Sequence, residues 1–251
     1  MKSLIIFLLV LLIPFSNHAL TENGEKELQF SSEEFISYWD SVSPKFNKLR
    51  NKLEKDYKKF DKSEKFLKMV FYRSQLHLLY DYYQYSTVEE LIESGKFDCV
   101  SGSFLMAAFL DFYGFDYQII ETSHHVFLLV ELDKQQIILE STDSFNGFIS
   151  DKNEVASYLA EFKSDAKNNT LYLHPDQRAI NSLINPSIYR TIDLKELKGL
   201  EYFNKAIYYN NQKNLKNAFE EITKAESYYA SERILTLKRL IQTQLSLAVN
   251  Y

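Results

Sequence analysis

The chain has few of the residues that build turns and cross-links. Its 251 residues include one cysteine, six glycines and four prolines. A single thiol excludes an intramolecular disulfide framework and any zinc or iron–sulfur site held by several cysteines. We expect no metal or other cofactor. So few glycines and prolines disfavour a sandwich of many short strands and predict a chain rich in helix. The single cysteine, Cys99, is therefore either a packing residue or a reactive one.

An excess of positive charge is also absent. The chain has 29 basic and 34 acidic residues and a net charge of −5 at pH 7. This balance argues against a nucleic-acid partner, because binding to phosphates depends on basic side chains. Hydrophobic residues make up 45% of the chain and charged residues 25%. That composition is typical of one or two globular domains with a buried core.

The first 19 residues predict export. Lys2 precedes an almost continuous apolar run over residues 4–15, and Ala19 offers a cleavage site. A retained membrane anchor is the alternative, but Pro14 interrupts the run before the roughly 20 apolar residues that a span requires. No later segment has such a run. We therefore expect a signal peptide at residues 1–19 and a mature protein in the periplasm or outside the cell.

Export makes the unpaired thiol informative, because oxidising compartments tend to pair thiols or lose them. Burial of Cys99 as a small hydrophobic residue is one explanation. Its neighbours suggest another, since Asp98 is a good N-cap for a helix over residues 99–113 that Gly114 would end. The first turn of such a helix favours a thiolate and offers a backbone amide to an oxyanion.

Helices are also predicted ahead of this thiol. A capping box at residues 31–34 starts the first, and mixed lysines and acids over residues 45–68 indicate a solvated helix face. Apolar and aromatic residues over 66–85 predict a central buried helix. A short helix starts near residues 86–90 and ends at Gly95.

Strand patterns follow the thiol helix, at residues 116–121, 125–132 and 136–139. A two-residue reversal at Asp133 and Lys134 would place His125 and Glu140 on one face of a hairpin as diagonal neighbours. A three-residue loop would pair His125 with Asp143 instead. The length of this loop therefore decides between the two acids.

A thiol at a helix N-terminus, an imidazole on a strand and a carboxylate on the next strand follow the order that thiol acyl transfer needs. Residues 94–101, 123–131 and 137–143, with 146–148 after them, resemble the matching stretches of the transglutaminase-like, papain-related superfamily. The resemblance covers residues 87–148. It implies an α+β fold in which the nucleophile helix packs on a small antiparallel sheet.

The same resemblance implies Cys99 as the nucleophile, His125 as the base and later proton donor, and Glu140 as the acid that orients the imidazole. Glu140 departs from the aspartate that is commoner in the family, although Thr142 after it fits. Adjacent His124 has the wrong strand parity and is expected to be an exposed imidazole at the loop end. The second oxyanion donor of such enzymes has no candidate in the sequence.

The C-terminal part has a different pattern. A helix is predicted at residues 152–162 and an irregular stretch at 163–192, followed by helices. Small and aromatic residues over 199–232 resemble one tetratricopeptide repeat, with a helix over 231–249 after it. One repeat is too short for an independent solenoid, so we expect this hairpin to pack on the preceding domain.

These observations divide the chain into a signal peptide (1–19), a transglutaminase-like domain with N-terminal helices (20–192) and a tetratricopeptide-like helical region (193–251). They predict an exported cysteine-dependent enzyme that hydrolyses peptide or isopeptide bonds without a cofactor. A catalytically inactive binding or scaffold module of the same fold is the alternative. The expected partner is a peptide or protein substrate, with no nucleic acid and no membrane span after signal cleavage; the C-terminal helices could hold a further partner.

Overall fold

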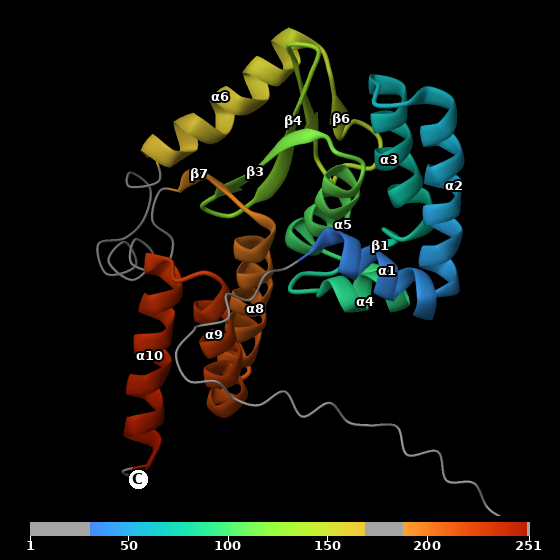
Figure 1. The fold of residues 1–251 in the computed structure, drawn as a ribbon. Helices are drawn as coiled ribbons and strands as arrows, with labels where there is room; N and C mark the ends of the chain where they lie inside the picture. Colours follow the sequence, from blue (N-terminus) through green and yellow to red (C-terminus); the bar gives the residue numbers. More distant parts are fainter. Residues whose placement is uncertain (1–30, 169–187, 250–251) are drawn as a thin grey trace, which may run out of the picture.

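The computed structural model describes residues 31–168 and 188–249 of the chain. In these two segments helices surround a small antiparallel sheet, so the protein is of the predicted α+β class (Figure 1). The predicted signal peptide lies outside the described residues. Among the helices that are described, none combines the length and the apolar character needed to cross a membrane.

Three helices lead the described chain, and each begins at a serine cap. They are α1 (Ser32–Val42), α2 (Pro44–Phe60) and α3 (Glu64–His77). The predicted continuous helix over residues 45–68 is wrong, because Asp61 has a left-handed backbone with φ of 51° and Ser63 caps a new helix. The charged face of α2 is solvated as predicted, whereas its apolar face packs toward the core.

The helix predicted over residues 66–85 ends early, at His77. A short strand, β1 (Asp81–Tyr82), follows it and pairs in parallel with β2 (Lys96–Phe97). The Tyr83 N–H donates to the Phe97 carbonyl, so the backbone of this segment is satisfied by the chain just before the thiol helix. Its tyrosines consequently lie on the surface and not in the core.

Two predicted helices are confirmed around the thiol. Helix α4 (Val88–Ser94) begins with a capping box at Thr87 and ends at Gly95, which adopts φ of 84°. Helix α5 (Cys99–Phe112) begins at the predicted cap, Asp98. Nearly every residue of α5 after Cys99 is buried, so this helix forms the centre of the core.

The sheet is antiparallel and has the strand order β6-β5-β4-β3-β7. Alternate residues of β4 face opposite layers, because successive side chains of a strand point to opposite faces. Leu128 packs in the large cluster that contains α5, whereas Phe127 packs in the smaller cluster that contains α6. The strands and this helix are β3 (Asp116–Thr122), β4 (Val126–Leu132), β5 (Gln135–Leu139), β6 (Phe148–Ile149), β7 (Tyr189–Ile192) and α6 (Lys152–Asn168).

The irregular stretch predicted over residues 163–192 is wrong at both ends. Helix α6 continues to Asn168, and β7 joins the sheet beside β3. The strand supplies partners for backbone groups of β3 that would otherwise remain at an open edge. Strand β7 has only four residues of mixed polarity. This pattern is too short to predict a strand from the sequence.

Three helices complete the described chain and confirm the predicted helical C-terminal region: α8 (Leu194–Asn211), α9 (Leu215–Tyr228) and α10 (Glu232–Val249). Helix α8 packs against both α5 and α9 (Figure 1). Gly199 permits a close approach, because a Cβ there would lie 2.5 Å from the Cβ of Tyr229. The hairpin therefore packs on the preceding domain, as its length predicts.

Candidate active site

The turn between β4 and β5 places Glu140, and not Asp143, beside His125. Asp133 and Lys134 form the predicted two-residue loop with positive φ values of 49° and 67°. In the resulting register the Nε2 atom of His125 contacts the Oε2 atom of Glu140. The Asp143 carboxylate instead accepts the backbone N–H groups of its own turn.

Besides the contact with His125, Glu140 accepts three hydrogen bonds from two residues. Its Oε1 atom accepts the backbone N–H of Thr142 at 2.8 Å and also the Thr142 hydroxyl. Its Oε2 atom accepts the hydroxyl of Tyr158 at 2.6 Å. Burial of the carboxyl opposes ionisation, but the hydrogen bonds and the charge of His125 outweigh it and lower the pKa of Glu140. The side chain is therefore an oriented carboxylate.

Tyr158 is a functional candidate that the sequence did not reveal. It lies on α6, which crosses the face of the sheet opposite α5, and Phe162 one turn later stacks on the His125 ring at 5.7 Å between centroids. Both residues fit an ordinary apolar helix stripe. Only their placement over the β4–β5 hairpin shows that one side chain orients the acid and the other covers the imidazole.

The imidazole of His125 interacts with both of its expected partners. Burial favours the neutral ring, but hydrogen bonds to Cys99 and Glu140 together with their charges outweigh it and raise the pKa of His125 to about 10. Because Nε2 faces Glu140, the Nδ1 atom is left for the thiol. This arrangement favours the protonated ring, an imidazolium, between the two side chains.

Cys99 opens helix α5 and has a free, partly exposed thiol. The Asp98 carboxylate accepts the N–H groups of Val100 and Ser101 at 3.0 and 2.9 Å. Its backbone carbonyl accepts the N–H of Gly102. The Cys99 amide itself is therefore the first-turn group left to stabilise an oxyanion.

The small residue one turn after the thiol serves the packing of the site. A Cβ on Gly102 would lie 2.7 Å from the Oγ atom of Ser141, the residue that follows Glu140. On the other side of Gly102, the hydroxyl of Ser103 donates to the Val126 carbonyl at 3.3 Å. Helix α5 can thus approach both β4, which begins directly after His125, and the segment that carries Glu140.

Cys99 and His125 line a cavity of about 370 Å³ that the C-terminal helices help to form. Exposed His124 also lines it but has no place in the contact with Glu140, as its strand parity predicts. Helices α8 and α10 supply part of the lining, namely Phe203, Asn204, Ile207, Asn210, Asn211, Arg233, Leu237 and Leu240. The predicted core and helical region thus share one candidate site.

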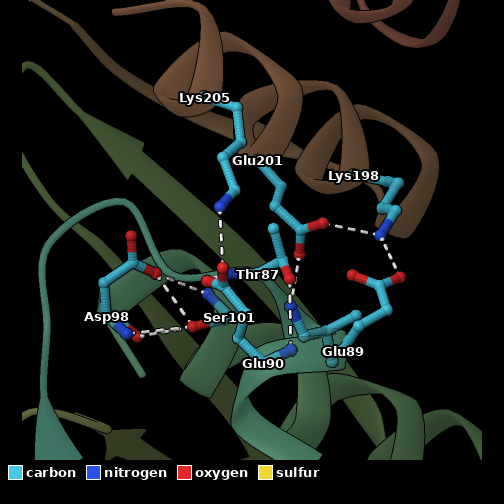
Figure 2. A network of polar contacts seen from close by, with 9 residues as sticks. Thr87, Glu89, Glu90, Asp98, Ser101, Lys198, Glu201 and Lys205 are labelled. Carbon is cyan, nitrogen blue, oxygen red and sulfur yellow. Dashed lines mark hydrogen bonds and ion pairs between the residues drawn. The ribbon is translucent and has the colours of Figure 1, made fainter. Parts of the chain in front are cut away.

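A polar network fastens α8 to the elements around the thiol (Figure 2). Lys198 donates to Glu89 at 2.9 Å and to Glu201 at 2.6 Å, and Glu201 accepts the N–H of the first residue of α4. Lys205 pairs with Glu90 at 2.9 Å. The network positions α8, and so one wall of the cavity, against α4.

Neither a metal site among the described residues nor a similar protein adds to the chemistry of Cys99, His125 and Glu140. Within the described segments, no group of three or more His, Cys, Asp or Glu side chains could hold a metal ion. No protein family, curated protein or solved structure matches the chain. The contacts of His125 with Cys99 and Glu140 are therefore the features that indicate a function.

Proposed function

We propose that the chain is an exported cysteine-dependent enzyme with a transglutaminase-like core, and that it hydrolyses peptide or isopeptide bonds. The observation that supports this function is the His125 imidazole, which interacts with the Cys99 thiol on one side and with the Glu140 carboxylate on the other. A base in contact with a nucleophile on one side and an orienting acid on the other is the arrangement that thiol acyl transfer requires.

The proposed reaction has two steps. The Cys99 sulfur attacks the carbonyl carbon of an amide, and the oxyanion that forms accepts a hydrogen bond from the Cys99 N–H. His125 donates its proton to the leaving nitrogen as the C–N bond breaks, which yields an amine and a thioester. His125 then takes a proton from water, whose oxygen attacks the thioester. The acid leaves and the sulfur departs as a thiolate beside the protonated ring, which restores the starting pair.

Hydrolysis is proposed over transfer to an amine because water is always available to an exported protein. The side chain of His125 retains 21% exposure and Cys99 is partly exposed, so water has access to the thioester. Glu140 remains ionised throughout and holds one tautomer and orientation of the ring.

Labelling with a peptide-based electrophile that traps cysteine nucleophiles tests this proposal. We expect the probe to label Cys99 in the wild-type protein at pH 6, and the rate to fall by about 100-fold in His125→Ala, which is the lower end of the effect of a general base. His124→Ala is the matched control, because His124 lines the same cavity without contacting Glu140, and it should label normally. If His125→Ala is labelled as fast as His124→Ala, the result would favour the alternative, a catalytically inactive binding module.

A further inference from the structure

A buried cation forms part of the wall of the cavity. Arg233 of α10 is only 6% exposed, and its guanidinium lies 4.7 Å from the centre of the Phe203 ring. One of its nitrogens pairs with the Glu121 carboxylate at 3.1 Å, and another donates to the Ser123 carbonyl at 3.5 Å. Among the described residues its Nε atom has no hydrogen-bond acceptor.

Glu121 does not neutralise this cation by itself, because it is shared. The fully buried carboxylate also pairs with Arg190 at 2.7 Å and accepts the Tyr229 hydroxyl at 2.6 Å. One negative charge therefore faces two guanidinium groups. Burial lowers the pKa of Arg233 although the charge of Glu121 opposes this change. An additional anion near Arg233 would consequently be stabilised.

The lining of the cavity has the same positive sign. No aspartate or glutamate is among the described residues that line it, and Arg233 is its single lysine or arginine. The carboxylates nearest to the site are already engaged, since Asp98 caps α5 and Glu140 orients His125. The polar lining also includes carboxamides that can bond to a peptide backbone, namely Gln84, Asn204, Asn210 and Asn211.

We infer that Arg233 binds a carboxylate of the substrate, and that this enzyme acts on peptides with a negative charge close to the bond that Cys99 attacks. The inference rests on the proposed function for the identity of that bond. A cavity of about 370 Å³ accommodates only a small ligand, so the carboxylate and the reacting carbonyl must belong to neighbouring groups. A guanidinium suits this purpose because its planar N–H groups match a carboxylate.

Two small reagents test the anion site without requiring an enzymatic reaction. Iodoacetate is negatively charged and iodoacetamide is neutral, and both alkylate the same thiolate. The ratio of the iodoacetate rate to the iodoacetamide rate at one pH therefore does not depend on how much thiolate is present. In wild type we expect this ratio to exceed that of glutathione by about tenfold, the lower end of electrostatic focusing in a cleft. A ratio equal to that of glutathione would overturn the inference.

Variants of two arginines on α10 assign the effect to one side chain. Arg233→Gln should lower the ratio severalfold, because only the His125 imidazolium then remains to attract iodoacetate, whereas Arg233→Lys should retain more of it. Arg239→Gln is the matched control, because Arg239 is exposed and lies outside the cavity lining, and it should leave the ratio unchanged. Circular dichroism identifies variants that do not fold. A folded Arg233 variant with the wild-type ratio would overturn the inference.

Protection of Cys99 by short peptides distinguishes the two sources of a carboxylate. A tripeptide with a free C-terminus is compared with its C-terminal amide, and a blocked peptide containing Glu is compared with its Gln twin. In at least one pair, we expect the peptide that carries the carboxylate to slow iodoacetamide alkylation about tenfold more than its neutral twin at equal concentration. Equal protection within both pairs would contradict carboxylate recognition. Loss of reactivity at pH 6 in His125→Ala would still support the proposed function.

Discussion

Glu140 contacts the Nε2 atom of His125 at the open end of the hairpin formed by β4 and β5, and Tyr158 donates to the same carboxylate oxygen. The hairpin therefore places acid and imidazole together, and α6 holds the acid from the opposite side. Because Nε2 is engaged in this way, the ring presents Nδ1 to Cys99. A single two-residue turn thus determines which acid meets the imidazole.

Replacement of the acid tests this relationship. Glu140→Gln keeps the size of the side chain but removes the charge that raises the pKa of His125. Loss of an orienting acid reduces turnover by up to about 10⁴-fold in related chemistry, so we expect a loss of roughly tenfold or more in iodoacetamide alkylation of Cys99 at pH 6. Asp143→Asn is the matched control and should react as wild type does. A larger loss of alkylation in Asp143→Asn than in Glu140→Gln would show that Asp143, and not Glu140, is the orienting acid.

The pH dependence of stability should show the imidazolium. The pKa of His125 in the folded protein is raised above 6.5 to about 10. Its contribution to stability is therefore fully present below pH 6.5 and is lost as the pH rises through about 10. In urea unfolding, the free energy of unfolding of wild type should fall more steeply between these pH values than that of His125→Gln. Parallel curves would show that His125 has no raised pKa.

The network beneath α8 should be important for stability. Lys198→Met leaves Glu201, which is 2% exposed, without its cation, and loss of one partner of a buried pair costs about 3–5 kcal/mol. Lys224→Met is the control, since Lys224 forms an exposed pair with Glu221 whose loss costs at most about 1 kcal/mol. Urea unfolding measures both, and equal losses would refute the role of the network.

The same network predicts a dependence on pH. Burial raises the pKa of Glu201 to about 7 even with Lys198 present, so without this cation the carboxyl is neutral in mildly acidic solution. A neutral carboxyl is cheaper to bury than an anion. The loss of stability in Lys198→Met should therefore be smaller at pH 5.5 than at pH 8. The opposite order would show that Glu201 is not the group left unpaired.

Gly102→Ala should separate the thiol helix from the acid segment. The added methyl would meet Ser141 Oγ at 2.7 Å and its Cβ at 2.8 Å, and such overpacking costs about 1–3 kcal/mol. The double variant with Ser141→Gly should recover stability and Cys99 reactivity, because the Ser141 hydroxyl has no hydrogen-bond partner among the described residues. Thermal unfolding and alkylation measure the two effects. A double variant no better than Gly102→Ala would contradict this contact.

The predictions that the structure confirms concern short-range signals. Asp98 and Thr87 begin helices because their side chains accept N–H groups two or three residues away. The turn at Asp133 and Lys134 also depends on neighbouring residues, and it fixes the register that brings Glu140 to His125. Local geometry of this kind can be predicted from the order of residues alone.

Other predictions failed where distant segments supply the partners. The helix expected to continue to residue 85 ends at His77, and the chain then pairs with the segment before α5. Strand β7 forms because β3 provides an edge from a part of the chain about 70 residues earlier. Hydrogen bonds between such segments leave no periodic pattern in either one.

The sequence by itself determined the α+β class and the cap before Cys99, and it limited the acid to Glu140 or Asp143, because these features depend on residues within a few positions or on one short hairpin. The structure decided for Glu140 through the two-residue turn. Only the tertiary structure placed Tyr158 on the acid and Arg233 in the cavity wall. Both side chains come from helices remote in the chain, and their pairing with buried carboxylates is a consequence of how those helices pack, which a local pattern does not encode.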